Sequence, residues 1–289
     1  MEKAPIFETI NRELDSYKNY LFGQGLSANT QRDYVSRLRQ FLSFLMESGR
    51  RDLDLADRTA LSEAVFSYWD FLKNVKKTTA GTLNNNLTAI DSFFHFLGVR
   101  HVKATSLRER AETLSTRILS DEELNRFLAA AEKRRSSRDR ALALVLVHTG
   151  IKISECRALD VDDVVLTSHT CKLIVRNNGR KQSIARELTI NDVTRKALLT
   201  WLIERSKCTN EDDDPALFLS ATKRRLGLAG IDFILRRIGW SANLVVSAQT
   251  LRRTFLTNQL ISGQTPTKVA MIAGYSGPST VDRYLVRKD

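Results

Sequence analysis

The segment that most constrains the fold of this chain is a run of seven apolar residues, from Ala141 to Val147. Flanked by Arg140 and His148, it reads as a helix that is apolar nearly all round, and such a helix is stable only when other elements cover every side. Thr149-Gly150 is a typical end for it. We therefore expect a domain built around one central, buried helix.

Four amphipathic segments precede this run. Ser27 and Asn29 are cap-type residues that open one of them, and the apolar positions of all four recur every three or four residues, which predicts helices. The apolar positions lie around residues 6–21, at Tyr34, Leu38, Phe41, Leu42 and Leu45, in 61–72 and in 83–97. Residues 1–100 are thus expected to form a small all-α domain. Residues 101–117 lack clean periodicity and carry several cations, which indicates a basic linker.

Residues 118–289 are expected to form the second domain. Ser120 with Glu123 is a capping box that opens a helix. Residues 173–175 and 184–190 read as two strands on either side of an Asn-Gly turn with a basic tip, which predicts an antiparallel β-hairpin. Helical patterns follow at 193–203, 231–238, 251–261 and 267–272. The fold class is therefore mainly α, with one small antiparallel hairpin or sheet.

Composition excludes several other classes of protein. The chain has 289 residues, 42% of them hydrophobic, which is enough for two globular domains. No run of about 18 apolar residues occurs and the first residues have no signal-peptide pattern, so we expect a cytoplasmic protein outside the membrane. Three cysteines without CxxC spacing and four scattered histidines favour neither a disulfide framework nor a metal site.

The net charge of +12 is uneven, because residues 118–289 hold 28 basic and 19 acidic side chains. A polyanion such as nucleic acid is the natural partner of such a surface. The alternative is a basic surface without a special partner. RNA is a weaker candidate than DNA, since no aromatic RNA-reading motif is present.

Short polar and cationic side chains on the predicted N-terminal helices and the linker suit phosphates and base edges. A solvated helix face is the alternative for each of them. The candidates for DNA contact are Arg32, Arg37, Arg39, Thr78, Thr79, Asn84, Asn85, Arg108 and Arg110, with Arg253 in the second domain.

Arg252 and Tyr284 stand 32 residues apart in the basic C-terminal half. A phenol that attacks a phosphodiester needs a cation to neutralise the phosphate, and these two side chains supply both groups. Taken singly, Tyr284 is better interpreted as a surface aromatic and Arg252 as a salt-bridge partner.

Several motifs in order make the chain resemble a tyrosine recombinase of the phage integrase family over nearly its whole length. The motifs are residues 26–30 with Tyr34, Leu38 and Phe41, then 149–155 with Leu159, 186–190, 217–220, 249–255, 273–276 and Tyr284. The resemblance implies an N-terminal, SAM-like four-helix core-binding domain and a C-terminal catalytic domain that together clamp duplex DNA.

The resemblance also implies a chemistry. Tyr284 would attack a DNA phosphate to form a 3′-phosphotyrosyl link, Arg252 would bind the phosphate oxygens, and Lys181 on the hairpin would protonate the departing 5′-oxygen. No cofactor or metal is implied, and the partners would be duplex DNA and further copies of the chain, as a dimer or tetramer. Only five residues follow Tyr284, where relatives commonly extend further, so altered self-association is expected.

Three positions depart from the family pattern. Lys152 stands where an arginine is expected, Gln249 where a histidine is usual, and Tyr275 where a histidine or tryptophan is usual. Lysine keeps the charge without the planar fork of arginine, and glutamine donates a hydrogen bond but takes no proton. Two functions stay open: a site-specific recombinase for integration, excision or resolution, or an impaired recombinase-like protein that occupies DNA or assists a partner.

Overall fold

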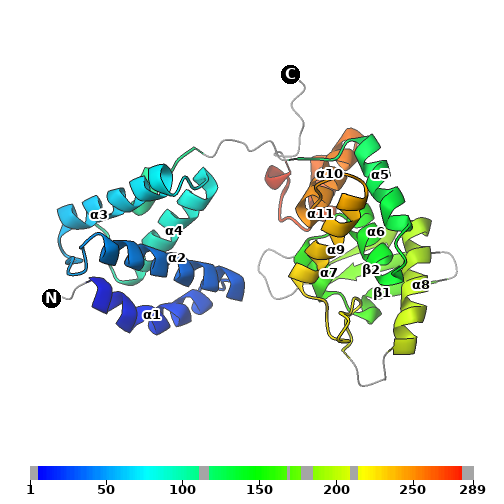
Figure 1. Ribbon diagram of the computed structural model, residues 1–289, viewed down its shortest axis with the longest axis horizontal. Helices are drawn as coiled ribbons and strands as arrows, with labels where there is room; N and C mark the ends of the chain where they lie inside the picture. The colour runs from blue at the N-terminus through cyan, green and yellow to red at the C-terminus, as the bar shows by residue number, and fades with distance from the viewer. Residues whose placement is uncertain (1–5, 111–116, 168–169, 177–184, 209–213, 282–289) are drawn as a thin grey trace. The chain divides into compact units, whose positions relative to one another are not determined.

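Figure 1 shows the computed structural model of the protein, which describes residues 6–110, 117–167, 170–176, 185–208 and 214–281. The chain divides into two compact units, residues 1–114 and 115–289. Each unit has its own hydrophobic core.

The described part of the first unit is mainly helical, as the sequence predicts. Its helices are α1 (Ile6–Gly23), α2 (Ala28–Glu47), α3 (Arg58–Asp70) and α4 (Ala80–Phe96). The Ser27 hydroxyl caps α2 by accepting the Thr30 N–H at 3.2 Å, which confirms the predicted start. The apolar stripes of the helices meet in one core, where the Tyr17 and Phe93 rings pack edge to face with centroids 5.0 Å apart.

Two short elements extend this unit beyond its four helices. A π-helical turn, Phe71–Val75, continues α3. A 3₁₀ helix, Ala104–Leu107, is fastened to α4 because the Asp91 carboxylate accepts the N–H groups of Ala104 at 2.5 Å and Thr105 at 2.9 Å. Residues 104–107 therefore pack on the first unit, although they fall in the segment expected to be a linker. Sequence periodicity gives no sign of this long-range contact.

The second unit surrounds the central helix α6 (Ser137–Thr149), as the run from Ala141 to Val147 predicts. Contacts to α6 come from α5 (Asp121–Glu132), α8 (Asp192–Cys208), α9 (Leu228–Ser241), α10 (Ala248–Ile261) and the strand β3 (Arg186–Ile190). The predicted capping box of α5 is present in both directions between Ser120 and Glu123. Gly150 ends α6 in the left-handed conformation, with φ +60°.

Three antiparallel strands form one small sheet beside these helices (Figure 1). They are β1 (Val164–Leu166), β2 (Cys171–Val175) and β3 (Arg186–Ile190), in the order β1-β2-β3, and Leu173 pairs with both Val164 and Leu188. The predicted pairing of β2 with β3 is confirmed, while its tip, residues 177–184, lies outside the described residues. Strand β1 is additional, because three residues are too few to give an alternating pattern.

The fold class is thus mainly α with a small antiparallel sheet. No described helix has the length and apolar character needed to cross a membrane. Within the same ranges, no group of histidine, cysteine and carboxylate side chains is placed to hold a metal ion. Cys156 and Cys171 are buried free thiols, and burial raises the pKa of Cys156 to about 12.

Candidate active site

Arg252 lies on the inner face of α10 and is almost completely buried, with 3% of its surface exposed. One terminal nitrogen donates to the Gly150 carbonyl at 2.6 Å and the other to the Ala273 carbonyl at 2.8 Å. A guanidinium has five N–H groups, so three remain for another acceptor beyond these described bonds. The two carbonyls fix the plane of the cation.

Gly150 shows why this arrangement needs a glycine at the end of α6. Its φ of +60° is disfavoured for other residues, and a Cβ there would lie 2.3 Å from a ring carbon of Phe255. Phe255 stands on α10, three residues after Arg252. The close approach of α6 and α10 therefore brings the Gly150 carbonyl to the guanidinium.

Lys152 is placed by the short helix α7 (Ile153–Ala158), for which it is the N-cap residue. Its backbone N–H donates to the Glu155 carboxylate at 2.7 Å, and its side-chain nitrogen lies 4.0 Å from the same carboxylate. The lysine side chain is 35% exposed and Glu155 is buried. Glu155 thus holds Lys152 through both backbone and charge.

Arg186, the first residue of β3, forms a two-pronged ion pair with Glu155. The two N–H···O distances are 3.1 and 2.9 Å, and both side chains are only 7% exposed. The third nitrogen of Arg186 donates to the Ile272 carbonyl at 2.7 Å, near the end of α11 (Pro266–Ala273). One arginine therefore ties the sheet to α7 and α11.

Tyr275 follows α11 and lies against both cations. Its ring centroid is 5.0 Å from the guanidinium carbon of Arg252 and 5.6 Å from the ammonium of Lys152. Gly274 makes the preceding turn with φ +67°, and a Cβ there would lie 2.5 Å from a terminal nitrogen of Arg186. The structure thus brings Arg252, Lys152 and Tyr275 into one cluster, which we call the cation cluster.

Gln249 stands one turn before Arg252 on α10 and is exposed. Residues three apart are neighbours on a helix surface, so Gln249 lies next to Arg252 along α10, although Gln249 is exposed and Arg252 is buried. Arg253, the candidate DNA contact in this unit, is partly exposed on the same helix. Tyr284 and Lys181, the expected nucleophile and acid, lie outside the described residues.

Electrostatics in the cluster act mainly on Lys152. Burial is the largest effect and lowers the pKa of this lysine, and Arg252 and Arg186 lower it further, while Glu155 and Tyr275 raise it; the net pKa is below the ordinary value. Burial by itself raises the pKa of Glu155, but the hydrogen bonds and charge of Arg186, with help from Lys152, bring that pKa below its ordinary value. Glu155 is therefore the anion that compensates the cations.

The candidate DNA contacts of the first unit differ in how far their polar groups are already engaged. The amide of Asn84 exchanges two hydrogen bonds with the backbone of Glu109, at 2.8 and 2.9 Å. Thr78 donates to the Leu72 carbonyl and Thr79 caps α4. Arg108 donates to Thr88, and Arg32 donates to Asn29. Arg32, Arg39, Asn85, Arg108 and Arg110 are exposed and Arg37 is half-buried.

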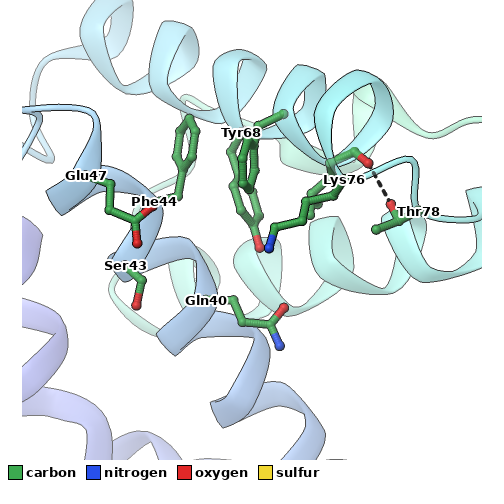
Figure 2. Close-up of a pocket in the computed structure, with 9 residues that line it drawn as sticks. Gln40, Ser43, Phe44, Glu47, Tyr68, Lys76 and Thr78 are labelled. Atoms are coloured by element: carbon green, nitrogen blue, oxygen red, sulfur yellow. Dashed lines mark hydrogen bonds between the residues drawn. The ribbon is translucent and has the colours of Figure 1, made fainter.

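One of these residues, Thr78, lines a hollow of about 430 Å³ in the first unit. Figure 2 shows Phe44 and Tyr68 within it, with Gln40 and Ser43 on the α2 side and Thr78 on the opposite side. One carboxylate, from Glu47, and one ammonium, from Lys76, line the same hollow. Opposite charges around aromatic rings give no single preference for an anion, so the cation cluster is the stronger candidate for a phosphate.

Glu155 and Arg186 are the residues of this site to which sequence reasoning assigns no role. Both fall inside the recognised motifs, but α7 is only six residues long and gives no periodic pattern. The spacing from Lys152 to Glu155 was the available signal, since residues three apart face each other in a helical turn. The pairing with Arg186, 31 positions later, depends on the fold.

Each of the two units matches the profile of a known family. Residues 117–289 match the profile described as the phage integrase family, and residues 14–101 match that of the phage integrase N-terminal SAM-like domain. Similar curated proteins include a TnP I resolvase of Bacillus thuringiensis, 26% identical over 93% of this chain and 93% of the relative. Another is the tyrosine recombinase XerC of Herpetosiphon aurantiacus, 29% identical over 95% of this chain and 90% of the relative.

Solved structures show the same fold. The Tn1549 transposon integrase in complex with circular intermediate DNA has a TM-score of 0.73 at 18% identity, covering 94% of each chain. The XerH site-specific recombinase bound to its difH substrate has a TM-score of 0.70 at 21% identity, covering 89% of this chain and 77% of that one.

The two profiles follow the division of the chain into two units, one profile for each unit. The first profile covers more than half of the chain. The chain belongs to the phage integrase family of tyrosine recombinases, which confirms the family predicted from its motifs.

Proposed function

We propose that this protein is a site-specific DNA recombinase that cuts and rejoins duplex DNA through a phosphotyrosyl intermediate, with the cation cluster as its phosphate site. The observation that carries the proposal is the position of Arg252, which two backbone carbonyls orient and which faces Tyr275 beside Lys152. A preorganised set of donors of this kind stabilises the charge that collects on a phosphate during attack.

In the proposed reaction the phenolic oxygen of Tyr284 attacks the phosphorus atom. The phenol gives its proton to water, a new P–O bond to tyrosine forms as the bond to the 5′-oxygen breaks, and Lys181 delivers a proton to that oxygen. The product is a 3′-phosphotyrosyl link and a free 5′-hydroxyl. Attack by a 5′-hydroxyl from another strand reverses these steps, so rejoining needs no nucleotide cofactor or metal.

The remaining residues of the site hold the phosphate. Arg252 and Lys152 neutralise its oxygens, and the Tyr275 hydroxyl and the Gln249 amide donate hydrogen bonds to it. Exposed cations of the first unit, such as Arg32 and Arg39, and Arg253 of the second unit contact the DNA backbone. Relatives with solved structures are described as bound to DNA, and one as a tetramer on a Holliday junction, which supports DNA and further copies of this chain as the partners.

One observation favours a second function, that of a DNA-binding protein which does not cut. Gln249 occupies a position where the family pattern expects a histidine, and an amide takes no proton at neutral pH. If the reaction requires a base there, binding persists without chemistry. The protein would then occupy its site or assist an active recombinase.

Nicked duplex substrates distinguish the two functions. A nick next to the cleavage point lets the short fragment with the new 5′-hydroxyl diffuse away, so the covalent protein–DNA product accumulates and is seen on a denaturing gel. We expect such a product from the natural sequence and none from Tyr284→Phe, which should keep its DNA affinity. Binding without covalent product at any substrate position would support the non-cutting function instead.

A further inference from the structure

Glu155 is the one carboxylate that faces Lys152 among the described residues, and it is fully engaged. Its two oxygens accept both prongs of Arg186 and the Lys152 backbone N–H, and the Lys152 ammonium lies 4.0 Å away. A buried carboxylate with this many partners has little freedom to move. It therefore fixes the place of the lysine at the start of α7.

Three other groups face the Lys152 ammonium from the elements packed around it. Arg252 lies on α10, Arg186 on β3 and Tyr275 after α11. The two arginines repel the positive charge of Lys152, and partial burial removes water that would stabilise that charge. An arginine at position 152 would stay charged in these surroundings, because the guanidinium holds its proton far more strongly than an amine. A lysine needs an anion close by.

We propose that Glu155 is a positioning residue that keeps the Lys152 ammonium charged and in place at the phosphate site, and that this site consequently loses activity as the pH rises. The inference rests on the proposed function and deepens it. Because position 152 holds a lysine instead of an arginine, one group that binds the phosphate can lose its proton. Glu155 determines the pH at which this loss occurs.

The direction of the pH dependence follows from the ionisation of the Lys152 amine. The pKa of Lys152 lies below its ordinary value, mainly because of burial and the neighbouring arginines, and Glu155 opposes that change. Lys152 is a cation below its pKa and neutral above it, so phosphate stabilisation is complete at lower pH and is lost as the pH rises through that pKa. Replacing the carboxylate with an amide removes the opposing charge and moves the loss to lower pH.

The first experiment measures the single-turnover rate of covalent product on a nicked duplex across pH, for four full-length proteins: the natural sequence, Glu155→Gln, Lys152→Arg and the double variant. We expect the natural protein to lose about tenfold in rate per pH unit on its alkaline limb, as for one essential proton. Glu155→Gln should move this limb to lower pH, and Lys152→Arg should move it to higher pH. In the double variant the shift should be absent.

Two results of this experiment would overturn the proposal. One is an alkaline limb that persists unchanged in Lys152→Arg, since the titrating group would then be another residue. The other is a shift caused by Glu155→Gln that also occurs in the double variant, since Glu155 would then act without Lys152. If Glu155→Gln fails to fold, the comparison of the natural protein with Lys152→Arg still decides whether Lys152 is the titrating group.

A second measurement needs no reaction on DNA and separates failure of this inference from failure of the proposed function. Trace acetylation with acetic anhydride, followed by peptide mass spectrometry, reports the fraction of each lysine that is neutral at each pH. In Glu155→Gln the midpoint for Lys152 should move to lower pH, while Lys172, paired with Glu187 on the sheet, serves as the unchanged control. An unmoved Lys152 midpoint overturns the inference; a moved midpoint in a protein that forms no covalent product refutes only the proposed reaction.

Discussion

At the scale of single residues, the site depends on a cation that the protein itself orients. Arg252 is buried and bonded to two carbonyls that lie 123 positions apart in the chain, at Gly150 and Ala273. These bonds serve the fold as well as the proposed chemistry, because each carbonyl needs a donor once it is out of water. Loss of this side chain therefore affects stability and reaction together.

The first prediction compares Arg252→Ala with its neighbour Arg253→Ala. Removing Arg252 leaves two carbonyls without their donor and should cost about 2–4 kcal/mol of unfolding free energy, measured by urea denaturation. Arg253 is partly exposed, so its replacement should change stability by less than about 0.5 kcal/mol and weaken DNA binding. Equal stability losses in the two variants would contradict the role assigned to the Gly150 and Ala273 carbonyls.

Much of this residue-level account could be predicted from the sequence, and the missing part has a physical cause. The motifs identify Arg252, Lys152, Gln249 and Tyr275 as candidates, and the structure brings the arginine, lysine and Tyr275 together. Glu155 is the carboxylate that compensates these cations, and Arg186 holds it. Their pairing depends on α7, β3 and α11 meeting in space. Short elements leave little periodic signal, so the pairing could not be read from the sequence.

At the scale of elements, the end of α11 requires a glycine for two reasons: its backbone has a positive φ, and a side chain there would collide with Arg186. Gly274 has φ +67° and touches Arg186, whereas Gly263 has φ +85° and open space around its α-carbon. The two glycines therefore separate the cost of backbone strain from the cost of displacing the arginine.

We predict that Gly274→Ala lowers the unfolding free energy by about 1–2 kcal/mol more than Gly263→Ala, for which strain alone, about 1 kcal/mol, is expected. Gly274→Ala should also slow formation of the covalent product, because it moves Arg186 and hence Glu155. Urea denaturation and the nicked-substrate assay measure the two effects. A Gly274→Ala protein as stable as Gly263→Ala would show that Arg186 yields without cost.

The 3₁₀ helix Ala104–Leu107 provides a second test at this scale. Asp91 accepts two of its backbone N–H groups and the Thr105 hydroxyl, and residues near Ala104 complete the first core. We expect Asp91→Ala to cost about 2–3 kcal/mol in thermal or urea unfolding, since those donors lose a charged acceptor. Asp33→Ala, an exposed residue on α2, is the matched control and should be nearly neutral.

The fold itself was more accessible to sequence reasoning than these contacts. The buried run in α6, the capping box of α5 and the pairing of β2 with β3 all follow from strong local patterns. Strand β1 and the π-helical turn after α3 were not predicted, because each spans five residues or fewer and its hydrogen bonds depend on neighbouring elements.

At the scale of the whole molecule, the net charge of +12 predicts affinity for DNA that depends on salt. Arg32 and Arg39 are exposed cations on α2. If each neutralises one phosphate, the double variant Arg32→Ala with Arg39→Ala should reduce the slope of log affinity against log salt by about 1.8. Fluorescence anisotropy at several salt concentrations measures this slope.

A control of equal charge is available in the same chain. Arg12 and Arg135 are also exposed, and replacing both with alanine removes the same two charges. That pair should leave the slope nearly unchanged if the contacts on α2 are specific. Equal reductions by both pairs would mean that overall charge, rather than the α2 surface, determines DNA binding.

The central claim is that the cation cluster binds the DNA phosphate that Tyr284 attacks. The most direct measurement is an experimental structure of the Tyr284→Phe protein with an uncut duplex of its target site. We expect one backbone phosphate to accept hydrogen bonds from Arg252 and Lys152, with the aromatic ring at position 284 beside its phosphorus atom. A complex in which every phosphate lies away from Arg252, or in which position 284 points to a different phosphate, would contradict the account.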